Sequence, residues 1–210
     1  PPAPTPAALL VFAADHGVHA QGVTPWPQDV TAQMVANMAT GGAAVSVLAR
    51  QHGVTVQVVD IGVAADLGEL ADVVHRRIRP GTDDLAIGPA MSADEARHAL
   101  DIGAELAAAA IDAGHRSLLT GEMGIANTTA AATLVGVMCG RDAAEVTGRG
   151  TGIDDATLAR KVEVVRAAAR RAAGGTPMEV LSEVGGLEIA ALAGAMVAGA
   201  ARRVPVIIDG

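Results

Sequence analysis

Short apolar runs recur along the chain, each bounded by Gly, Asp or Pro. They cover residues 9–14, 54–61, 117–120 and 204–208. Continuous apolar runs, rather than alternating ones, are expected for interior parallel strands, because helices cover both faces of such a sheet. We therefore expect these runs to form a mainly parallel sheet.

Segments with helical spacing lie between the runs. They cover residues 30–38, 42–52, 92–113, 154–173 and 187–201. In the first, Val30, Met34 and Met38 share one face, and in the third, Ser92 and Glu95 have the spacing of a capping box. The fourth is predicted to bury Leu158, Val162, Val165 and Ala169, and the last is apolar nearly all round, which favours a buried helix.

The alternation of strands and helices predicts the fold class. It is typical of a single α/β domain, spanning residues 1–210, with a doubly wound, mainly parallel sheet and helices on both faces, as in Rossmann-like folds. Ligands of such folds bind past the carboxyl ends of the strands. Ligand-binding residues are therefore expected where the apolar runs end.

The composition restricts how the core is filled. Half of the 210 residues are hydrophobic, yet aromatic residues make up 1% and tyrosine is absent. Burial must then come from Ala, Val, Leu, Ile and Met, which predicts helices packed closely through Ala and Gly.

Charge and cysteine content narrow the partners and the compartment. The net charge of −8 argues against nucleic acid as a partner, because phosphate neutralisation needs a basic face. The single Cys139 fits a reducing cytosol and is expected to be a small core residue near a helix end. We expect a cytoplasmic protein with no membrane partner, because the start resembles no signal peptide and the apolar helix at 187–201 is too short to cross a bilayer.

Polar residues follow the first apolar run. Asp15, His16 and Gly17 stand where a strand delivers side chains to the ligand-binding edge, so they form either a site wall or a braced turn. Asp15, His16 and His19 have a spacing that a metal could use, but without a cysteine or a further carboxylate we expect no metal site.

A stiff segment precedes the first helix. Pro25 and Pro27 flank Trp26, the only tryptophan, which either lines a pocket for a flat ligand or simply covers the core. Gln28 and Gln33 either reach that pocket or lie solvated on the surface.

The stretch TGEMGIANTTAAATLVG is the strongest candidate for an anion site. Gly121 and Gly124 allow close approach of the backbone, and the helix that opens at Asn127 and Thr128 directs N–H groups into the bend. It is not a P-loop, because no Gly-Lys-Ser or Gly-Lys-Thr follows. The carboxylate of Glu122 in this bend would repel a bound anion, which is unfavourable unless the carboxylate binds a hydroxyl group or a cation.

A second glycine-rich stretch, VTGRGTGIDD, adds positive charge. Gly148, Gly150 and Gly152 permit close approach, and Arg149 and Lys161 are nearby cations. The stretch is either a solvated surface loop or, together with the first bend, part of a site for a phosphate ester.

Several of these motifs together resemble one family. ADHGV, GVTPWPQDVTAQMVANMATGGAAVSVLARQHG, GEMGIANTT, VTGRGTGIDDATLARKVEVV, EVGGLEIAALAGAM and RRVPVIIDG occur in the order found in nicotinate-nucleotide–dimethylbenzimidazole phosphoribosyltransferases of cobalamin biosynthesis. The resemblance implies transfer of the 5-phosphoribosyl group from nicotinate mononucleotide to 5,6-dimethylbenzimidazole with inversion, no cofactor, and a homodimer.

The resemblance also implies roles for individual residues. Glu122 would lie beside the ribose and the developing positive charge, and Gly124, Asn127 and Lys161 near the phosphate or nicotinate. Trp26, Gln28 and Gln33 would help to form the benzimidazole pocket.

The sequence departs from the family pattern at two points. Ala126 stands where the family motif has glycine, which adds a methyl group beside the ligand. Family members are also expected to begin earlier and to continue past the final IIDG, and their general base is expected in that C-terminal part, in a stretch resembling RLGEGTGA. Glu122, Asp15 and Asp209 are the candidates to replace it within the 210 residues. The alternatives are therefore a noncatalytic nucleotide-binding module or, less favoured, a sugar-phosphate isomerase that uses Asp15 and His16.

Overall fold

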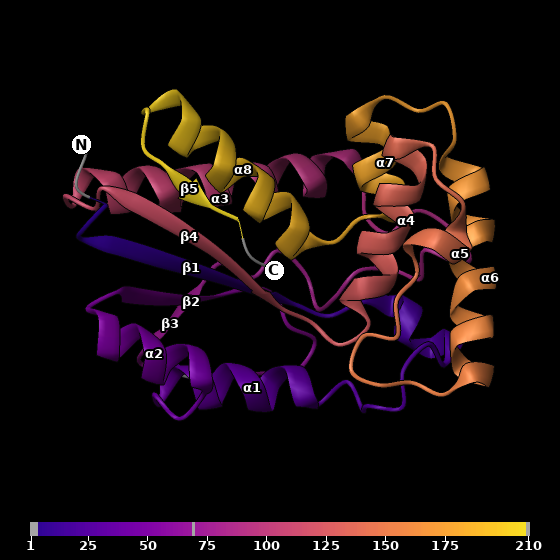
Figure 1. Ribbon diagram of the computed structural model, residues 1–210, viewed down its shortest axis with the longest axis horizontal. Coiled ribbons are helices and arrows are strands. Elements are labelled where there is room, and N and C mark those ends of the chain that lie inside the picture. The colour runs from indigo at the N-terminus through magenta and orange to yellow at the C-terminus, as the bar shows by residue number, and fades with distance from the viewer. Residues whose placement is uncertain (1–3, 69, 209–210) are drawn as a thin grey trace.

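The computed structural model describes residues 4–68 and 70–208, and its centre is a parallel five-stranded sheet (Figure 1). The strands lie in the order β3-β2-β1-β4-β5. They are β1 (Ala7–Ala14), β2 (Thr55–Gly62), β3 (Val73–His75), β4 (Ser117–Met123) and β5 (Val206–Ile207). The chain winds outward from β1 to β3 and then returns to the other side of β1, which confirms the predicted doubly wound sheet.

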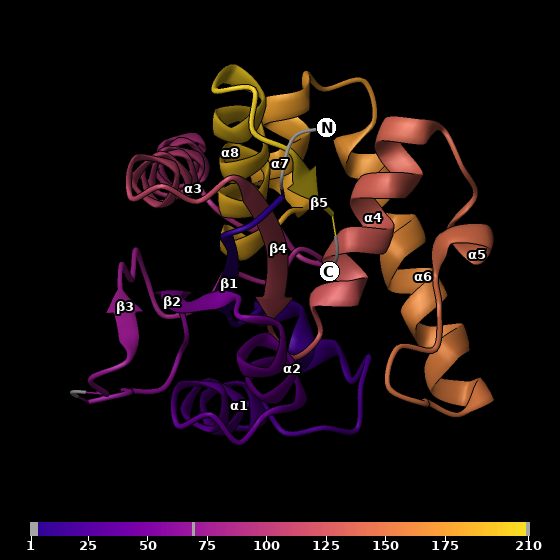
Figure 2. The same cartoon turned by 60° about the vertical axis from the view of Figure 1, so that its left-hand side comes forward.

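Helices cover both faces of this sheet (Figures 1 and 2). On one face lie α1 (Val30–Ala39) and α2 (Ala44–His52), and on the other α3 (Ala93–Asp112) and α8 (Leu187–Ala201). A further group gathers beyond the carboxyl ends of the strands: α4 (Asn127–Cys139), α5 (Ala143–Val146), α6 (Asp155–Ala172) and α7 (Pro177–Val184). A short 3-10 helix, η1 (Gly17–Gln21), follows β1.

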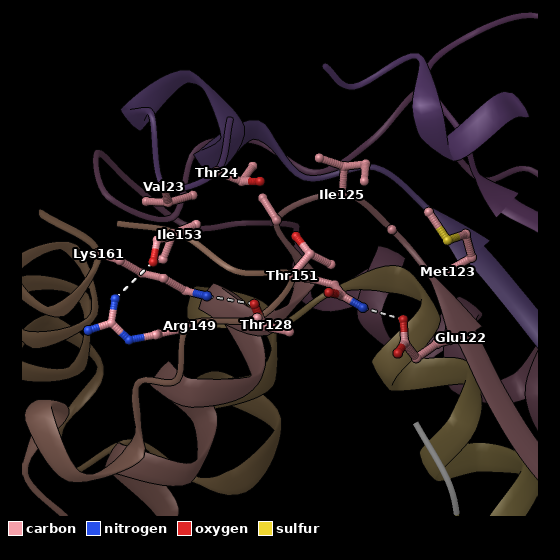
Figure 3. A pocket seen from close by; sticks show the side chains of 14 residues that line it. Val23, Thr24, Glu122, Met123, Ile125, Thr128, Arg149, Thr151, Ile153 and Lys161 are labelled. Atoms are coloured by element: carbon pink, nitrogen blue, oxygen red, sulfur yellow. Dashed lines mark hydrogen bonds between the residues drawn. The ribbon is translucent and has the colours of Figure 1, made fainter. Parts of the chain in front are cut away.

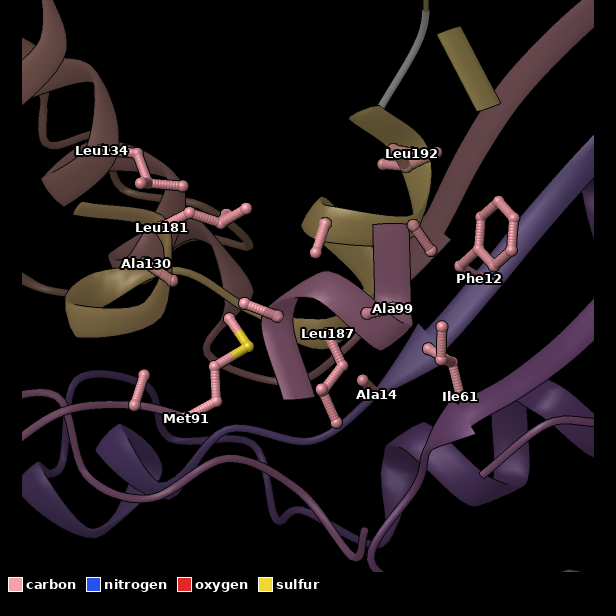
Figure 4. Packing of buried hydrophobic residues seen from close by; sticks show 14 of the residues in the cluster. Phe12, Ala14, Ile61, Met91, Ala99, Ala130, Leu134, Leu181, Leu187 and Leu192 are labelled. Carbon is pink, nitrogen blue, oxygen red and sulfur yellow. The ribbon is translucent and has the colours of Figure 1, made fainter. Parts of the chain in front are cut away.

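The helix pair α3 and α8 packs backbone against backbone. A Cβ atom at Gly103 would lie 1.9 Å from the Ala191 carbonyl oxygen, and one at Gly194 would lie 1.9 Å from that of Leu100. The predicted packing through small residues is therefore confirmed for this pair. Beneath it, the main core cluster includes Phe12, Ile61 and Leu187 (Figure 4).

The predicted end of β4 was wrong. The strand continues through Gly121, which pairs with Val11, and through Glu122, which pairs with Phe12. The chain turns only at Gly124, because the ladder with β1 holds the backbone extended up to Met123.

The shorter elements β3, α5 and α7 were not predicted from the sequence. The strand β3 has three residues, and α5 has four, so neither shows a period. The helix α7 has readable signals, since Thr176 and Glu179 form a capping box around a proline at its start.

The predicted face of α1 is partly buried, whereas the predicted burial of Cys139 was wrong. The buried residues of α1 are Thr31, Val35 and Met38, whereas Val30 and Met34 are half-buried. Cys139 is exposed, because α4 ends at the surface.

In α6 the buried residues are Lys161, Val165, Ala168 and Ala172, so of the predicted inward residues only Val165 is buried. Leu158, Val162 and Ala169, which were predicted to face inward, are only half-buried. The buried face of α6 is set by its packing against α4.

The residues Val30–His52 together are long and apolar enough to cross a membrane by composition alone. In the structure they form two helices, α1 and α2, that pack against β2.

Candidate functional site

The site lies at the switch point of the sheet. The neighbouring strands β1 and β4 are parallel, and the chain leaves them in different directions, toward η1 and toward α4. A crevice opens between such diverging connections at the carboxyl edge of the sheet. Asp15 and His16 follow β1, and Gly124 follows β4, so both motifs reach this edge.

A cavity of about 280 Å³ occupies the crevice (Figure 3). The two glycine-rich stretches, distant in the sequence, face each other across it. The residues predicted from those stretches that line it are Glu122, Gly124, Asn127, Thr128, Arg149, Gly150 and Lys161.

The turn that forms one wall is tightly fixed. A Cβ atom at Gly124 would lie 2.2 Å from the Ala14 carbonyl oxygen, so only glycine allows β4 to turn so close to β1. The Ile125 N–H donates to Thr31 Oγ1 at 3.0 Å, which ties the turn to α1. Ala126 then adopts φ of 76° at the N-cap of α4, in the left-handed region that favours glycine.

One end of the cavity carries a buried cation. Lys161 is 3% exposed, and its Nζ donates to Thr128 Oγ1 at 2.6 Å and to the Gly148 carbonyl oxygen at 3.4 Å. Among the described residues, no carboxylate forms an ion pair with it, and burial lowers the pKa of its ammonium group. A desolvated ammonium group with neutral partners is suited to bind an anion.

The glycine loop comes close to this cation. Gly150 has φ of 52°, and a Cβ atom there would lie 3.4 Å from Thr128 Oγ1 and 3.8 Å from Lys161 Nζ. The neighbouring Arg149 donates to the Ile153 carbonyl oxygen at 2.9 Å and pairs with Asp155, so it braces the loop at the rim.

The other end of the cavity carries a carboxylate. Asn127 Nδ2 donates to Glu122 Oε2, which holds the side chain at the start of α4 (Figure 3). The cavity is therefore positive toward Lys161 and negative toward Glu122. Such a polarity suits a ligand with an anionic group at one end and developing positive charge at the other.

Asp15 and His16 are buried and are not among the residues that line the cavity. His16 Nε2 lies 2.5 Å from Glu188 Oε1, and Asp15 Oδ2 accepts a hydrogen bond from the Ala64 N–H at 2.8 Å. Burial raises the pKa of the Asp15 carboxyl group. The ring of His19 bonds instead to the Trp26 carbonyl oxygen at 2.8 Å. Within residues 4–68 and 70–208, no group of three or more metal-binding side chains comes together.

The remaining predicted residues lie apart from the cavity lining. Trp26 is 47% exposed, Gln33 is exposed on α1, and Gln28 is half-buried close to Asp15. Gly121 lines a different, apolar cavity beside α2. Asp209 lies outside the described residues.

Sequence reasoning missed some of the lining residues and one buried partner. The cavity is also lined by Val23, Thr24, Thr151 and Ile153, and nothing in these residue types indicates a binding site. Glu188 did carry one, because a single carboxylate in an otherwise apolar helix needs a partner.

Comparisons with known proteins identify the family of the chain. A family model described as phosphoribosyltransferase matches residues 1–210. The chain is 54% identical to the nicotinate-nucleotide–dimethylbenzimidazole phosphoribosyltransferase of Salinispora tropica, over all of this chain and 62% of that protein. It is also 54% identical to the protein of the same name from Chloroflexus aggregans, over 98% of this chain and 59% of that protein.

A solved structure shows the same fold. The crystal structure of CobT from Thermus thermophilus matches with a TM-score of 0.94 and 45% identity, over 97% of this chain and 62% of that chain. The present chain thus spans about three fifths of the length of these relatives.

Proposed function

Because the chain belongs to the nicotinate-nucleotide–dimethylbenzimidazole phosphoribosyltransferase family, we propose that it acts on that family's substrates. The reaction transfers the 5-phosphoribosyl group of nicotinate mononucleotide to 5,6-dimethylbenzimidazole. Its products are α-ribazole 5′-phosphate, a precursor of the lower ligand of cobalamin, and nicotinate.

The observation that carries this proposal is the separation of charge along the cavity. The phosphate of the mononucleotide is held at the Lys161 end, where Thr128 and the Gly150 loop approach the ammonium group. The ribose then extends toward Glu122. A carboxylate there stabilises the positive charge that develops on C1′.

The chemistry requires no metal to activate the leaving group. The bond from C1′ to the pyridinium nitrogen breaks, and its electron pair neutralises that nitrogen as nicotinate departs. A benzimidazole nitrogen attacks the opposite face of C1′, which inverts the configuration, and the proton on its other nitrogen passes to a general base. Glu122 acts here as an electrostatic stabiliser.

Binding tests the proposal directly on this chain. Titration calorimetry with nicotinate mononucleotide should show binding that Lys161→Met weakens by about 10- to 100-fold, since a hydrogen bond to a charged group contributes roughly 1.5–3 kcal/mol. Arg170→Met, on the exposed face of the same helix, is the matched control and should bind normally. Nicotinate riboside, which lacks the phosphate, should bind both proteins equally. Equal affinity of the Lys161→Met variant for the mononucleotide would refute the assignment.

A second candidate function is binding without transfer. It is favoured by one observation: among the described residues that line the cavity, Glu122 is the only carboxylate, and it is bonded to Asn127, so no second carboxylate stands there as a general base. Adding dimethylbenzimidazole to the chain with bound mononucleotide, and assaying for α-ribazole phosphate, separates the two. Product formation supports the transferase, whereas binding without product supports the module.

A further inference from the structure

A buried pair of ionisable side chains lies beneath the cavity. His16 and Glu188 are both 0% exposed, and His16 Nε2 lies 2.5 Å from Glu188 Oε1. Among the described residues, His16 Nδ1 and Glu188 Oε2 have no other hydrogen-bond partner. The pair joins the end of β1 to the first turn of α8, and the proposed transfer reaction assigns it no role.

The register of the sheet directs His16 and Glu122 to the same face. Along β1, Phe12 and Ala14 belong to the core cluster beneath α8, and His16 continues this alternation. Glu122 is the partner of Phe12 in the neighbouring strand, so its side chain also leaves the sheet on the α8 side. Asp15 has the opposite parity and lies toward Ala64 and Thr31.

Two glycines hold the imidazole ring in place. A Cβ atom at Gly186 would lie 2.5 Å from His16 Cε1 and 2.6 Å from Glu188 Oε2. A Cβ atom at Gly124, in the cavity wall, would lie 3.4 Å from His16 Cδ2. The ring is therefore packed between the α8 N-terminus and the turn that follows Glu122, with no space to swing away.

The surroundings favour the charged form of the pair. Glu188 lies in the first turn of α8, where the helix N-terminus stabilises a carboxylate. Burial alone lowers the pKa of His16, but Glu188, and then Asp15 and Glu122, raise it more strongly, so that its pKa lies above the ordinary value. Of these carboxylates, Glu188 lies on α8, Glu122 lies on β4, and Asp15 is the chain neighbour of His16 directly after β1.

We propose that His16, held as an imidazolium by Glu188, is a positioning residue for Glu122: its buried positive charge keeps the cavity carboxylate ionised. The proposal rests on the proposed function only where it gives Glu122 a role beside the ribosyl cation. The coupling between His16 and Glu122 is a property of the unliganded protein. It can be measured without any substrate.

Removing the imidazolium should make Glu122 easier to protonate. Glu122 would then share its surroundings with the carboxyl groups of Glu188 and Asp15 and with no cation at position 16. A nearby opposite charge typically lowers the pKa of a carboxyl group by about 1–3. His16→Gln should therefore raise the protonation midpoint of Glu122, by up to about one pH unit.

Carbon-13 NMR of the unliganded chain, with labelled histidine and glutamate, tests both parts. In the wild type, His16 should keep its proton well above pH 6.5. In His16→Gln the glutamine amide can still donate to Glu188, so the buried hydrogen bond remains while the charge is lost. The matched control is His115→Gln, because His115 bonds to the Ala110 carbonyl oxygen and to Thr55 Oγ1 at the opposite edge of the sheet.

The outcomes are distinct. An upward shift of the Glu122 midpoint in His16→Gln, but not in His115→Gln, supports the proposal. If His16→Gln does not fold, the wild-type titration needs no variant: the Glu122 signal should shift a second time at the pH at which His16 loses its proton, and the absence of that second shift would overturn the proposal. The proposal is overturned if wild-type His16 loses its proton at or below pH 6.5, or if the Glu122 midpoint stays unchanged.

Substrate binding gives an independent readout. His16→Gln should weaken nicotinate mononucleotide binding more at pH 5 than at pH 8, with tenfold as the upper limit, because a midpoint shift of one pH unit changes proton binding at most about tenfold. A structural defect alone would weaken binding equally at both pH values. If the mononucleotide does not bind the wild type at all, the proposed function fails, whereas the NMR result still decides the coupling.

Discussion

Replacing Gly103 by alanine tests the backbone contact between α3 and α8, the helix layer that carries Glu188. The new Cβ atom would lie 1.9 Å from the Ala191 carbonyl oxygen and 2.6 Å from its carbonyl carbon. Because the obstacle is backbone, no rotamer change relieves it, and the helices must separate by about 1.5 Å to restore an ordinary contact.

The magnitude follows from two opposing effects. Overpacking of a well-packed core costs typically 1–3 kcal/mol, and a clash with backbone belongs at the upper end of that range. Alanine in place of glycine within a helix raises the free energy of unfolding by about 1 kcal/mol. The net loss in the free energy of unfolding is therefore about 2 kcal/mol. For a chain of this size it corresponds to a fall in Tm of roughly 4–8 °C.

Gly136 provides the matched control. It also lies within a helix, α4, but a Cβ atom there would meet the Arg141 carbonyl oxygen at 3.5 Å and Val146 Cγ2 at 3.7 Å, which are ordinary contacts. Gly136→Ala should therefore raise the free energy of unfolding by up to about 1 kcal/mol.

Urea denaturation followed by circular dichroism at 222 nm measures both variants against the wild type. The same chemical change should give opposite signs at the two positions. A folded Gly103→Ala protein that is as stable as Gly136→Ala would refute the close packing of α3 on α8.

Further predictions concern the cavity. Lys161 is the sole lysine, and burial lowers the pKa of its ammonium group. Between that pKa and about 10.5 the unfolded chain therefore binds more protons than the folded chain, so the free energy of unfolding should rise with pH in this window. In urea titrations at several pH values, Lys161→Met should abolish this rise. An equal slope in both proteins would contradict it. Ala126→Gly should remove about 1–2 kcal/mol of backbone strain in the left-handed region and cost about 0.5–1 kcal/mol through the greater flexibility of the unfolded chain, so Tm should rise by a degree or two. A lowered Tm would show that the methyl group packs favourably. Gly124→Ala, with its Cβ atom 2.2 Å from the Ala14 carbonyl oxygen, should abolish mononucleotide binding in calorimetry; retained affinity would show that the turn can move.

The sequence alone was sufficient for the fold class and for most of the longer elements. Continuous apolar runs predicted buried parallel strands, and the capping box at Ser92 and Glu95 marked the start of α3. These features are local, because the period of a strand or helix and the chemistry of a cap are set by residues a few positions apart.

The sequence also identified most of the cavity. One of the two interpretations of the glycine-rich stretches around Gly124 and Gly150 was that they form one site, and they do line a single cavity. A glycine in a strand-to-helix turn indicates that the backbone approaches another group closely, so these glycines were enough to identify the two stretches.

The tertiary structure alone decided how the charges are arranged. That Lys161 lies on the buried stripe of α6 depends on how α6 packs against α4, and that Gly121 stays in the strand depends on its pairing with Val11. The pairing of His16 with Glu188 joins residues 172 positions apart. Such contacts arise from the register of strands and the packing of helices, which bring together side chains that no local pattern relates.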